Sequence, residues 1–253
     1  MSLGCVVDNV QYGLWTLADS MGLVIVGNSF DAANKRQSDG GLVGLLLQDL
    51  SLPARVEDNR IVGFVFGIVL NNVLLTGMPF SLAAGSTISG NYIVRLGAEV
   101  EAGTLKAFGI DCAADGCVIS DNILLYNSPE YGGISVSGRN AVVERNQLRS
   151  MLKEAGSVRP IALLLARLGG NGSLGSVGGR LSGNLVLGVQ EGIVVFGNEG
   201  AEVLDNRVES EGQEVGFGIL LGASSRVRVQ GNRITNSTLP VATSGGTANV
   251  MAD

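Results

Sequence analysis

A short apolar run followed by asparagine recurs along almost the whole chain and constrains the fold more than any other feature. An aliphatic residue stands three positions before each of nine asparagines. An apolar residue also stands two positions after eight of them, with Gln11 as the exception. A unit that recurs this often predicts a repeat protein. The asparagines are Asn9, Asn28, Asn59, Asn91, Asn122, Asn146, Asn184, Asn206 and Asn232.

A second signature, of the form Gly-Ile-x-Leu, follows the asparagine after a variable gap. Aliphatic residues that alternate over a few positions are typical of a strand with one buried face. Each repeat can then bury its apolar face only by stacking on its neighbours. Eight copies occur, and they begin at Gly13, Gly44, Gly67, Gly109, Gly133, Pro160, Gly192 and Gly218.

The residue before each asparagine indicates a tight turn. Glycine or aspartate stands there in eight of nine copies, and Arg145 is the exception. Both residue types suit turns that need unusual backbone angles. We therefore expect the chain to turn at each asparagine, and the nine side-chain amides to stack as an internal ladder.

The spacing of the asparagines separates two repeat folds that carry such a ladder. Leucine-rich repeats have a period of roughly 20–29 residues, whereas the spacing here runs 19, 31, 32, 31, 24, 38, 22 and 26 residues. We predict an all-β fold, a single-stranded right-handed parallel β-helix of about nine coils. The repeat resembles that of the pectate-lyase-like superfamily over about residues 5–236. A leucine-rich-repeat solenoid is the alternative.

The same pattern predicts the domain organisation. Residues 1–236 form the β-helix, and residues 237–253, where the repeat is lost, form a tail or a cap. The chain begins inside a coil at Cys5, and solenoids need covered ends, so we expect a segment of a longer protein. No apolar run approaches twenty residues and no secretory signal is present, so no membrane span is predicted. An extracellular or cell-surface location is expected, with any export signal upstream.

Composition argues against some function classes. A net charge of −6 argues against a nucleic-acid-binding protein, which would usually carry an excess of basic residues. The chain has no histidine, which removes the commonest side-chain base and metal ligand. Its three cysteines form no metal-ligand pattern, and we expect no cofactor. Cys112 and Cys117 flank a predicted turn, where they are either a disulfide or two small buried residues.

Arginines gather on the outer face of the asparagine strand toward the C-terminus. The planar guanidinium groups of arginine bind carboxylates or sulfates of an acidic polysaccharide well. The alternative is that this face is simply exposed to solvent, with acidic residues between the arginines. Tyr126 and Tyr131 share one predicted loop and can stack on sugar rings. The candidate ligand-binding arginines are Arg180, Arg207, Arg228 and Arg233.

The outer face of the Gly-Ile strand is expected to be mostly apolar. Exposed apolar rows commonly mark contacts, so we predict an interface here with a second copy, another protein or a neighbouring segment. Polar insertions at 31–40, 96–107 and 149–159 leave the rod at one corner and can wall a groove. The outward residues are Trp15, Leu46, Val69, Asp111, Ser135, Ala162, Val194 and Leu220.

The resemblance implies two catalytic patterns. Polygalacturonase-like members combine aspartates with a histidine, which this chain lacks. Pectate-lyase-like members hold calcium with aspartates beside a basic residue, and Asp111, Asp115 and Lys106 are the candidates here. The main hypothesis is a non-catalytic module of a surface, secreted or phage-like protein that presents loops to a polysaccharide or another protein. The alternative is a polysaccharide lyase, epimerase or hydrolase, with calcium as the cofactor if it is a lyase.

Overall fold

The computed structural model describes residues 5–8, 10, 12–16, 22–32, 43–48, 50–71, 83–95, 107–126, 131–151, 161–166, 176–189, 191–209, 215–245 and 251–252. None of these residues is helical, and so no helix there is long and apolar enough to cross a membrane. The predicted insertions therefore lie largely outside the described residues.

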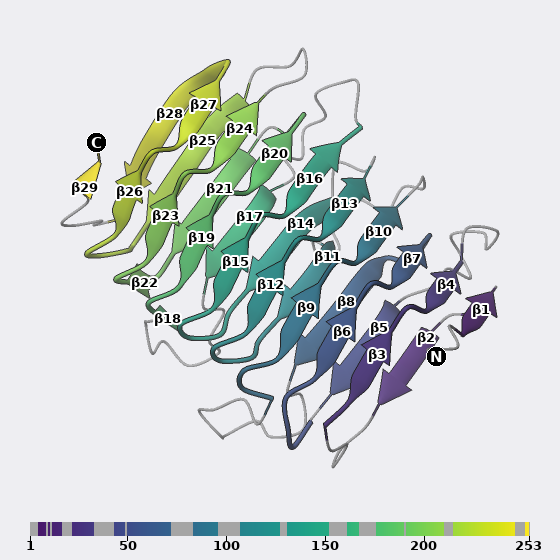
Figure 1. Cartoon of the computed structure of the whole chain (residues 1–253). Helices are drawn as coiled ribbons and strands as arrows, with labels where there is room; N and C mark the ends of the chain where they lie inside the picture. The colour runs from purple at the N-terminus through teal and green to yellow at the C-terminus, as the bar shows by residue number, and fades with distance from the viewer. Residues whose placement is uncertain are drawn as a thin grey trace.

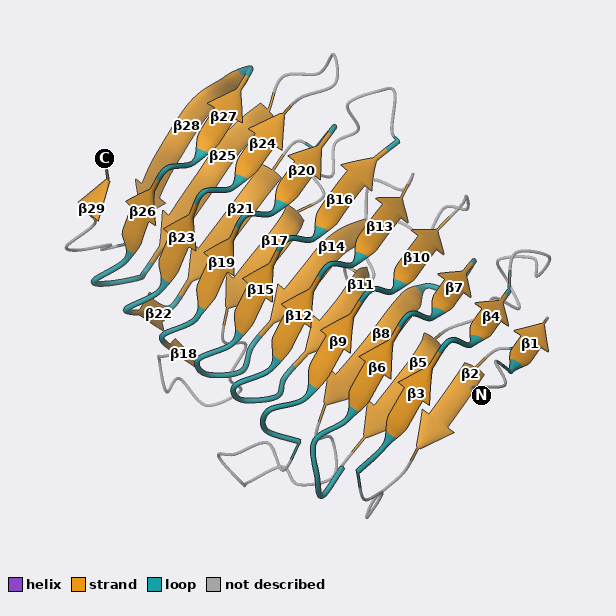
Figure 2. Ribbon diagram, viewed as in Figure 1, coloured by secondary structure: helices purple, strands orange, loops and turns teal. Residues whose placement is uncertain are grey.

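Three parallel sheets of nine strands each form the body of the protein (Figure 2). Sheet A contains β1 (Val6–Asp8), β4 (Ser29–Asp31), β7 (Arg60–Val62), β10 (Tyr92–Arg95), β13 (Ile123–Tyr126), β16 (Gln147–Ser150), β20 (Leu185–Leu187), β24 (Arg207–Glu209) and β27 (Arg233–Thr235). Sheet B contains β2 (Tyr12–Thr16), β5 (Val43–Gln48), β8 (Phe66–Asn71), β11 (Ala107–Cys112), β14 (Tyr131–Val136), β17 (Ile161–Ala166), β21 (Glu191–Phe196), β25 (Val215–Gly222) and β28 (Ser237–Ser244). Sheet C contains β3 (Val24–Val26), β6 (Arg55–Glu57), β9 (Thr87–Ser89), β12 (Val118–Ser120), β15 (Val142–Glu144), β19 (Arg180–Ser182), β23 (Glu202–Leu204), β26 (Arg228–Gln230) and β29 (Met251–Ala252).

The chain passes through sheets A, B and C in that order and repeats the circuit nine times. Each circuit is one coil, and equivalent strands of successive coils pair in parallel, so the coils stack into a rod with the two termini at opposite ends (Figure 1). The fold is a single-stranded, right-handed parallel β-helix. Three sheets per coil exclude the leucine-rich-repeat alternative. Two short strands, β18 (Ser176–Val177) and β22 (Asn198–Glu199), add a small sheet at the corner between sheets B and C.

The predicted asparagine ladder is present at the corner between sheet C and sheet A. From Asn28 to Asn206, each Nδ2 donates to the Oδ1 of the asparagine one coil further on, at 2.9 to 3.1 Å. The same Oδ1 accepts the backbone N–H of the earlier asparagine. The amides thus pair with one another in the rod interior, where unpaired polar groups would be destabilising. The ladder comprises Asn28, Asn59, Asn91, Asn122, Asn146, Asn184, Asn206 and Asn232.

The backbone before each ladder asparagine confirms the predicted turn with unusual backbone angles. The preceding residue has a φ between 53° and 68° at all eight positions. Arg145 adopts this left-handed conformation as well, at a φ of 54°. Its guanidinium forms a two-pronged ion pair with Asp121 of the previous coil, at 2.9 and 3.0 Å, which helps to hold a residue that is otherwise disfavoured there.

The apolar run that precedes Asn9, the first asparagine expected in the ladder, differs in register from the other runs. Asn9 itself lies outside the described residues, but β1 pairs with β4 and aligns Val6 with Ser29. Cys5 therefore occupies the register before Ser29, and its backbone N–H donates to Asn28 Oδ1 at 3.0 Å. The first apolar run is a strand of sheet A, whereas the other runs that precede asparagines are strands of sheet C.

Pro160 was equated with the glycine of the second signature, and that register is wrong by two residues. Leu163 pairs with Ile134 on one side and with Ile193 on the other. Ala162 therefore takes the glycine position in this coil and is buried. The outward position belongs to Leu164, and Ala162 is not part of the outer face of sheet B.

The glycine position explains how the coils approach one another. A Cβ built on Gly67 would lie 2.4 Å from the carbonyl oxygen of Gly109 in the next coil, and one on Gly192 would lie equally close to that of Gly218. Such a Cβ would also press against inward side chains of sheet A, such as Ile93 beside Gly67. Small residues are therefore required at this position in the strands of sheet B.

The region predicted as a tail continues the repeat. Residues Ser237–Ser244 form β28, which pairs with β25 along its length. Met251 and Ala252 form β29, which pairs with β26. The boundary expected at residue 236 thus falls inside the ninth coil. The polar composition of residues 237–253 lacks the apolar pattern by which the other coils are recognised.

Candidate functional site

The four candidate arginines divide between two faces of the rod. The turn at the asparagine separates sheet C from sheet A, so the predicted single face does not exist. Arg207 and Arg233 are direct register partners in sheet A. Arg180 and Arg228 lie on sheet C, on either side of Glu202.

The residue directly after each ladder asparagine points outward from sheet A, and Val6 takes this position in the first coil. We call this row the sheet A column. Tyr92 and Ile123 in its middle are each 38% exposed, and both arginines at its C-terminal end are exposed. The column consists of Val6, Ser29, Arg60, Tyr92, Ile123, Gln147, Leu185, Arg207 and Arg233.

Ion pairs neutralise some arginines of the sheet A column but not all of them. Arg60 pairs with Asp31 at 3.2 Å, and Arg207 pairs with Glu209 of its own strand. Arg233 has Thr235 at the position equivalent to Glu209. Among the residues that the structure describes, Arg233 has no ion-pair partner. The C-terminal end of the column therefore has two adjacent guanidinium groups and one paired carboxylate.

Of the two tyrosines proposed for sugar stacking, Tyr126 is not at the surface. Tyr126 is completely buried, because it points into the rod in register with Arg95 and Ser150, two further buried polar side chains. The backbone of Tyr131 belongs to β14, and its side chain lies outside the described residues. Tyr92 is the exposed tyrosine of the sheet A column, and its position directly after a ladder asparagine is the signal that identifies it.

Asp111 faces outward from sheet B between Val69 and Ser135 of the adjacent coils. Burial raises the pKa of its carboxyl group, and a hydrogen bond with Ser135 opposes that shift. Lys106 lies outside the described residues. Asp115 is not an evident partner, because its Oδ1 accepts the backbone N–H of Arg139 at 2.7 Å and holds a turn. Within the described ranges, no group of three or more acidic, cysteine or histidine residues is placed to hold a metal ion.

Replacing Asp111 by asparagine should stabilise the protein at neutral pH by about 1 kcal/mol, the usual size of a single-site effect. A raised pKa means that the folded state favours the protonated carboxyl, so its contribution is full in acid and is lost as the pH rises. Urea unfolding at about pH 3 and at pH 7 should therefore show the gain only at pH 7. Asp121→Asn is the matched control with the opposite sign, because the ion pair with Arg145 lowers the pKa of Asp121. A gain for Asp111→Asn that is equal at both pH values would contradict the assignment.

The outer face of sheet B is less exposed than its composition suggests. Trp15 is 49% exposed, and its Nε1 donates to Gln48 at 3.0 Å. Leu46 and Leu220 are partly exposed, whereas Val69 and Val194 are buried. The predicted interface stays a prediction, with Trp15 as its most accessible member.

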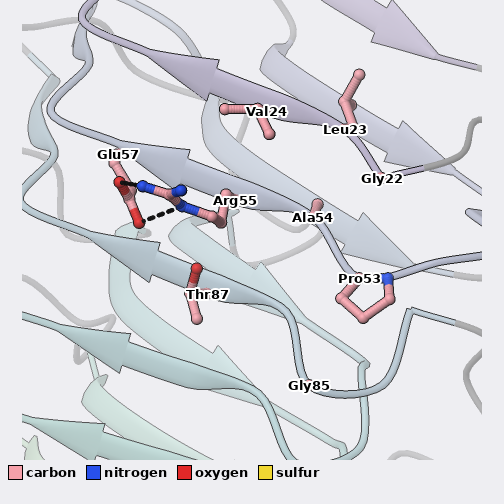
Figure 3. A pocket seen from close by; sticks show the side chains of 9 residues that line it. All are labelled: Gly22, Leu23, Val24, Pro53, Ala54, Arg55, Glu57, Gly85 and Thr87. Carbon is pink, nitrogen blue, oxygen red and sulfur yellow. Dashed lines mark hydrogen bonds and ion pairs between the residues drawn. The ribbon is translucent and has the colours of Figure 1, made fainter.

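A groove of about 480 Å³ crosses the outer side of sheet C near its N-terminal end (Figure 3). Val24 and Pro53 form much of its apolar wall, and Arg55 spans its side through a two-pronged ion pair with Glu57. The ion pair lowers the pKa of Glu57. No candidate residue from the sequence lies here, because the groove arises from the stacking of three coils rather than from a motif. It is lined by Gly22, Leu23, Val24, Pro53, Ala54, Arg55, Glu57, Gly85 and Thr87.

Comparisons with models of protein families, with curated proteins and with solved structures find no match.

Proposed function

We propose that this chain is a non-catalytic β-helix module of a surface, secreted or phage-like protein, and that it binds an acidic polysaccharide along the outer face of sheet A. The observation that carries the proposal is that Arg207 and Arg233 lie side by side, in register on adjacent strands, at the C-terminal end of the sheet A column.

Two adjacent guanidinium groups favour an anionic ligand. Strands in adjacent coils lie about 4.8 Å apart, so the like charges of Arg207 and Arg233 repel each other. Glu209 pairs with Arg207 alone. A carboxylate or a sulfate ester placed between the two forks can accept hydrogen bonds from both. The positive charge is local, because the chain as a whole carries −6.

The middle of the column supplies a different surface. Tyr92 and Ile123 present apolar area, and the tyrosine ring can pack against the carbon face of a sugar while its hydroxyl remains solvated. Four coils separate Tyr92 from Arg207, or about 19 Å along the rod. A ligand that contacts both places must be a chain molecule, and a rigid row of side chains binds it with little loss of conformational freedom.

The second candidate function is a polysaccharide lyase, epimerase or hydrolase, and Asp111 is the observation that favours it. A partly buried carboxyl group with a raised pKa is a candidate proton carrier. Product formation from uronate polymers, with and without calcium, distinguishes the two functions, because a binding module leaves the polymer intact.

The decisive experiment is calorimetric titration of the chain with long and short oligogalacturonates, sulfated oligosaccharides and a neutral glucan. We expect the acidic oligosaccharides that exceed about 19 Å to bind best. Arg207→Gln with Arg233→Gln should weaken their binding roughly a hundredfold, at about tenfold for each lost charge-assisted contact. Added salt should weaken binding to the wild type as well.

The matched control is Arg180→Gln with Arg228→Gln, which removes the same charge from nearby coils but from sheet C. An equal loss in both double variants would mean that net charge, and not sheet A, attracts the polymer. Binding of the neutral glucan alone would contradict the acidic ligand, and no binding to any member of the panel would contradict the function itself.

A further inference from the structure

Cys112 and Cys117 meet in the core at the corner between sheets B and C. Cys112 is the last residue of β11, and Cys117 directly precedes β12, so both belong to the fourth coil (Figure 1). Both are completely buried, whereas Cys5 is exposed. Both lie in the same hydrophobic core cluster, and the neighbouring Cys112 together with burial raises the pKa of Cys117.

The turn that joins the two cysteines is held by the coils on both sides of it. Asp115 accepts the backbone N–H of Gly85 through its carbonyl at 2.8 Å, and Gly116 donates its N–H to the carbonyl of Arg139 at 2.7 Å. A Cβ on Gly138 of the next coil would lie 2.0 Å from the carbonyl oxygen of Ala114. The tightly stacked turn therefore holds both cysteines at one buried corner of the core.

Other coils fill the same corner with residues that have no redox chemistry. The register of Cys112 is occupied by Leu70 in the preceding coil and by Val136 in the following one. The register of Cys117 is occupied by Ser86 and Ala141 in those coils. A large aliphatic residue beside a small one is thus enough for packing, and the fourth coil replaces both with thiols.

We infer that Cys112 and Cys117 are a dithiol that closes into an intramolecular disulfide during folding, with a small-molecule disulfide such as glutathione disulfide as the oxidant. One cysteine attacks the oxidant as a thiolate, forms a mixed disulfide and releases one molecule of thiol. The second cysteine attacks the mixed disulfide at the protein sulfur and releases the second thiol. Both protein thiol protons are transferred to the released thiols, and the two electrons reduce the oxidant.

Burial determines when this exchange takes place. The thiolate is the reactive form, and the folded corner disfavours it and excludes the oxidant. Closure therefore occurs while the corner is open, before folding is complete. The finished fold then shields the disulfide from reductants, as suits a chain that folds in an oxidising compartment.

The test is to refold the reduced, denatured Cys5→Ser chain with glutathione disulfide, alkylate it under denaturing conditions and map the peptides by mass spectrometry. We expect residues 112 and 117 to be linked, and the oxidised protein to melt about 5 °C higher, because the short loop restricts the unfolded chain. Folded, reduced protein exposed to the same oxidant should remain reduced.

Cys117→Ala with Cys5→Ser is the control, because a single remaining thiol can form only a mixed disulfide. Two thiols that remain alkylatable after oxidative refolding would overturn the proposal. So would a linked form that melts below the reduced protein, because a strained bond of that kind would not be compatible with the folded corner.

Discussion

Asn122→Ala is expected to lower the free energy of unfolding by about 4 kcal/mol. The Asn122 side chain accepts the backbone N–H and the Nδ2–H of Asn91, at 2.9 and 3.0 Å, and donates to the carbonyl of Ile88 and to Asn146 Oδ1, both at 2.9 Å. Alanine removes all four hydrogen bonds from the rod interior, where each group left unpaired is destabilising by roughly 1–3 kcal/mol. The measurement is urea unfolding followed by circular dichroism.

Asn232→Ala is the control for this substitution. Asn232 accepts the same two bonds from Asn206, but it lies in the last coil and is only partly buried. Water can replace the lost partners there, so we expect a loss of about 1 kcal/mol. Equal losses at both positions would show that burial does not set the stability of the ladder.

Gly133→Ala is expected to destabilise the fold by about 3 kcal/mol, the upper end of the usual effect of overpacking. The new Cβ would lie 2.1 Å from Leu148 Cδ2 and 2.4 Å from the carbonyl oxygen of Ala162. The leucine can rotate, but the carbonyl oxygen belongs to β17 and can move only if the pairing between β14 and β17 is disturbed. Thermal unfolding should therefore show a clearly lower Tm.

Gly22→Ala separates contact from backbone strain. Gly22 has a φ of 55°, and a Cβ there would meet nothing within 4 Å. We expect a loss of about 1 kcal/mol, because only the left-handed conformation disfavours alanine. A larger loss at Gly22 than at Gly133 would contradict the steric account of the glycine position.

The local features were predictable because each depends on a few neighbouring residues. An aliphatic run followed by Gly-Asn or Asp-Asn identifies a strand and a left-handed turn from Gly27 onward, and the eight predicted ladder positions that the structure describes are correct. The first apolar run, Val6–Asp8, has the same composition as a sheet C strand but pairs in sheet A. Short strands of both sheets bury one face and share one pattern.

Register was predictable only where a glycine identified it. Seven copies of the second signature contain that glycine, whereas the sixth coil has Ala162, and the alternation Ile161, Leu163, Leu165 allows a slip of two residues without moving an apolar side chain to the wrong face. The pairing of Leu163 with Ile134 and Ile193 resolves the ambiguity.

Sequence alone established the β-helix, its ladder and the residues that point inward, because stacked identical coils repeat one pattern of apolar residues. Which outward residues come together was decided by the tertiary structure. The turn at each asparagine divides one apparent face into sheets C and A, so it separates Arg180 from Arg207 while it brings Arg207 beside Arg233. It is likewise the stacking of coils that buries Tyr126, exposes Tyr92 and brings Cys112 against Cys117. These contacts depend on where the chain turns between sheets and on which residues of successive coils align. A pattern read along the sequence does not contain that information.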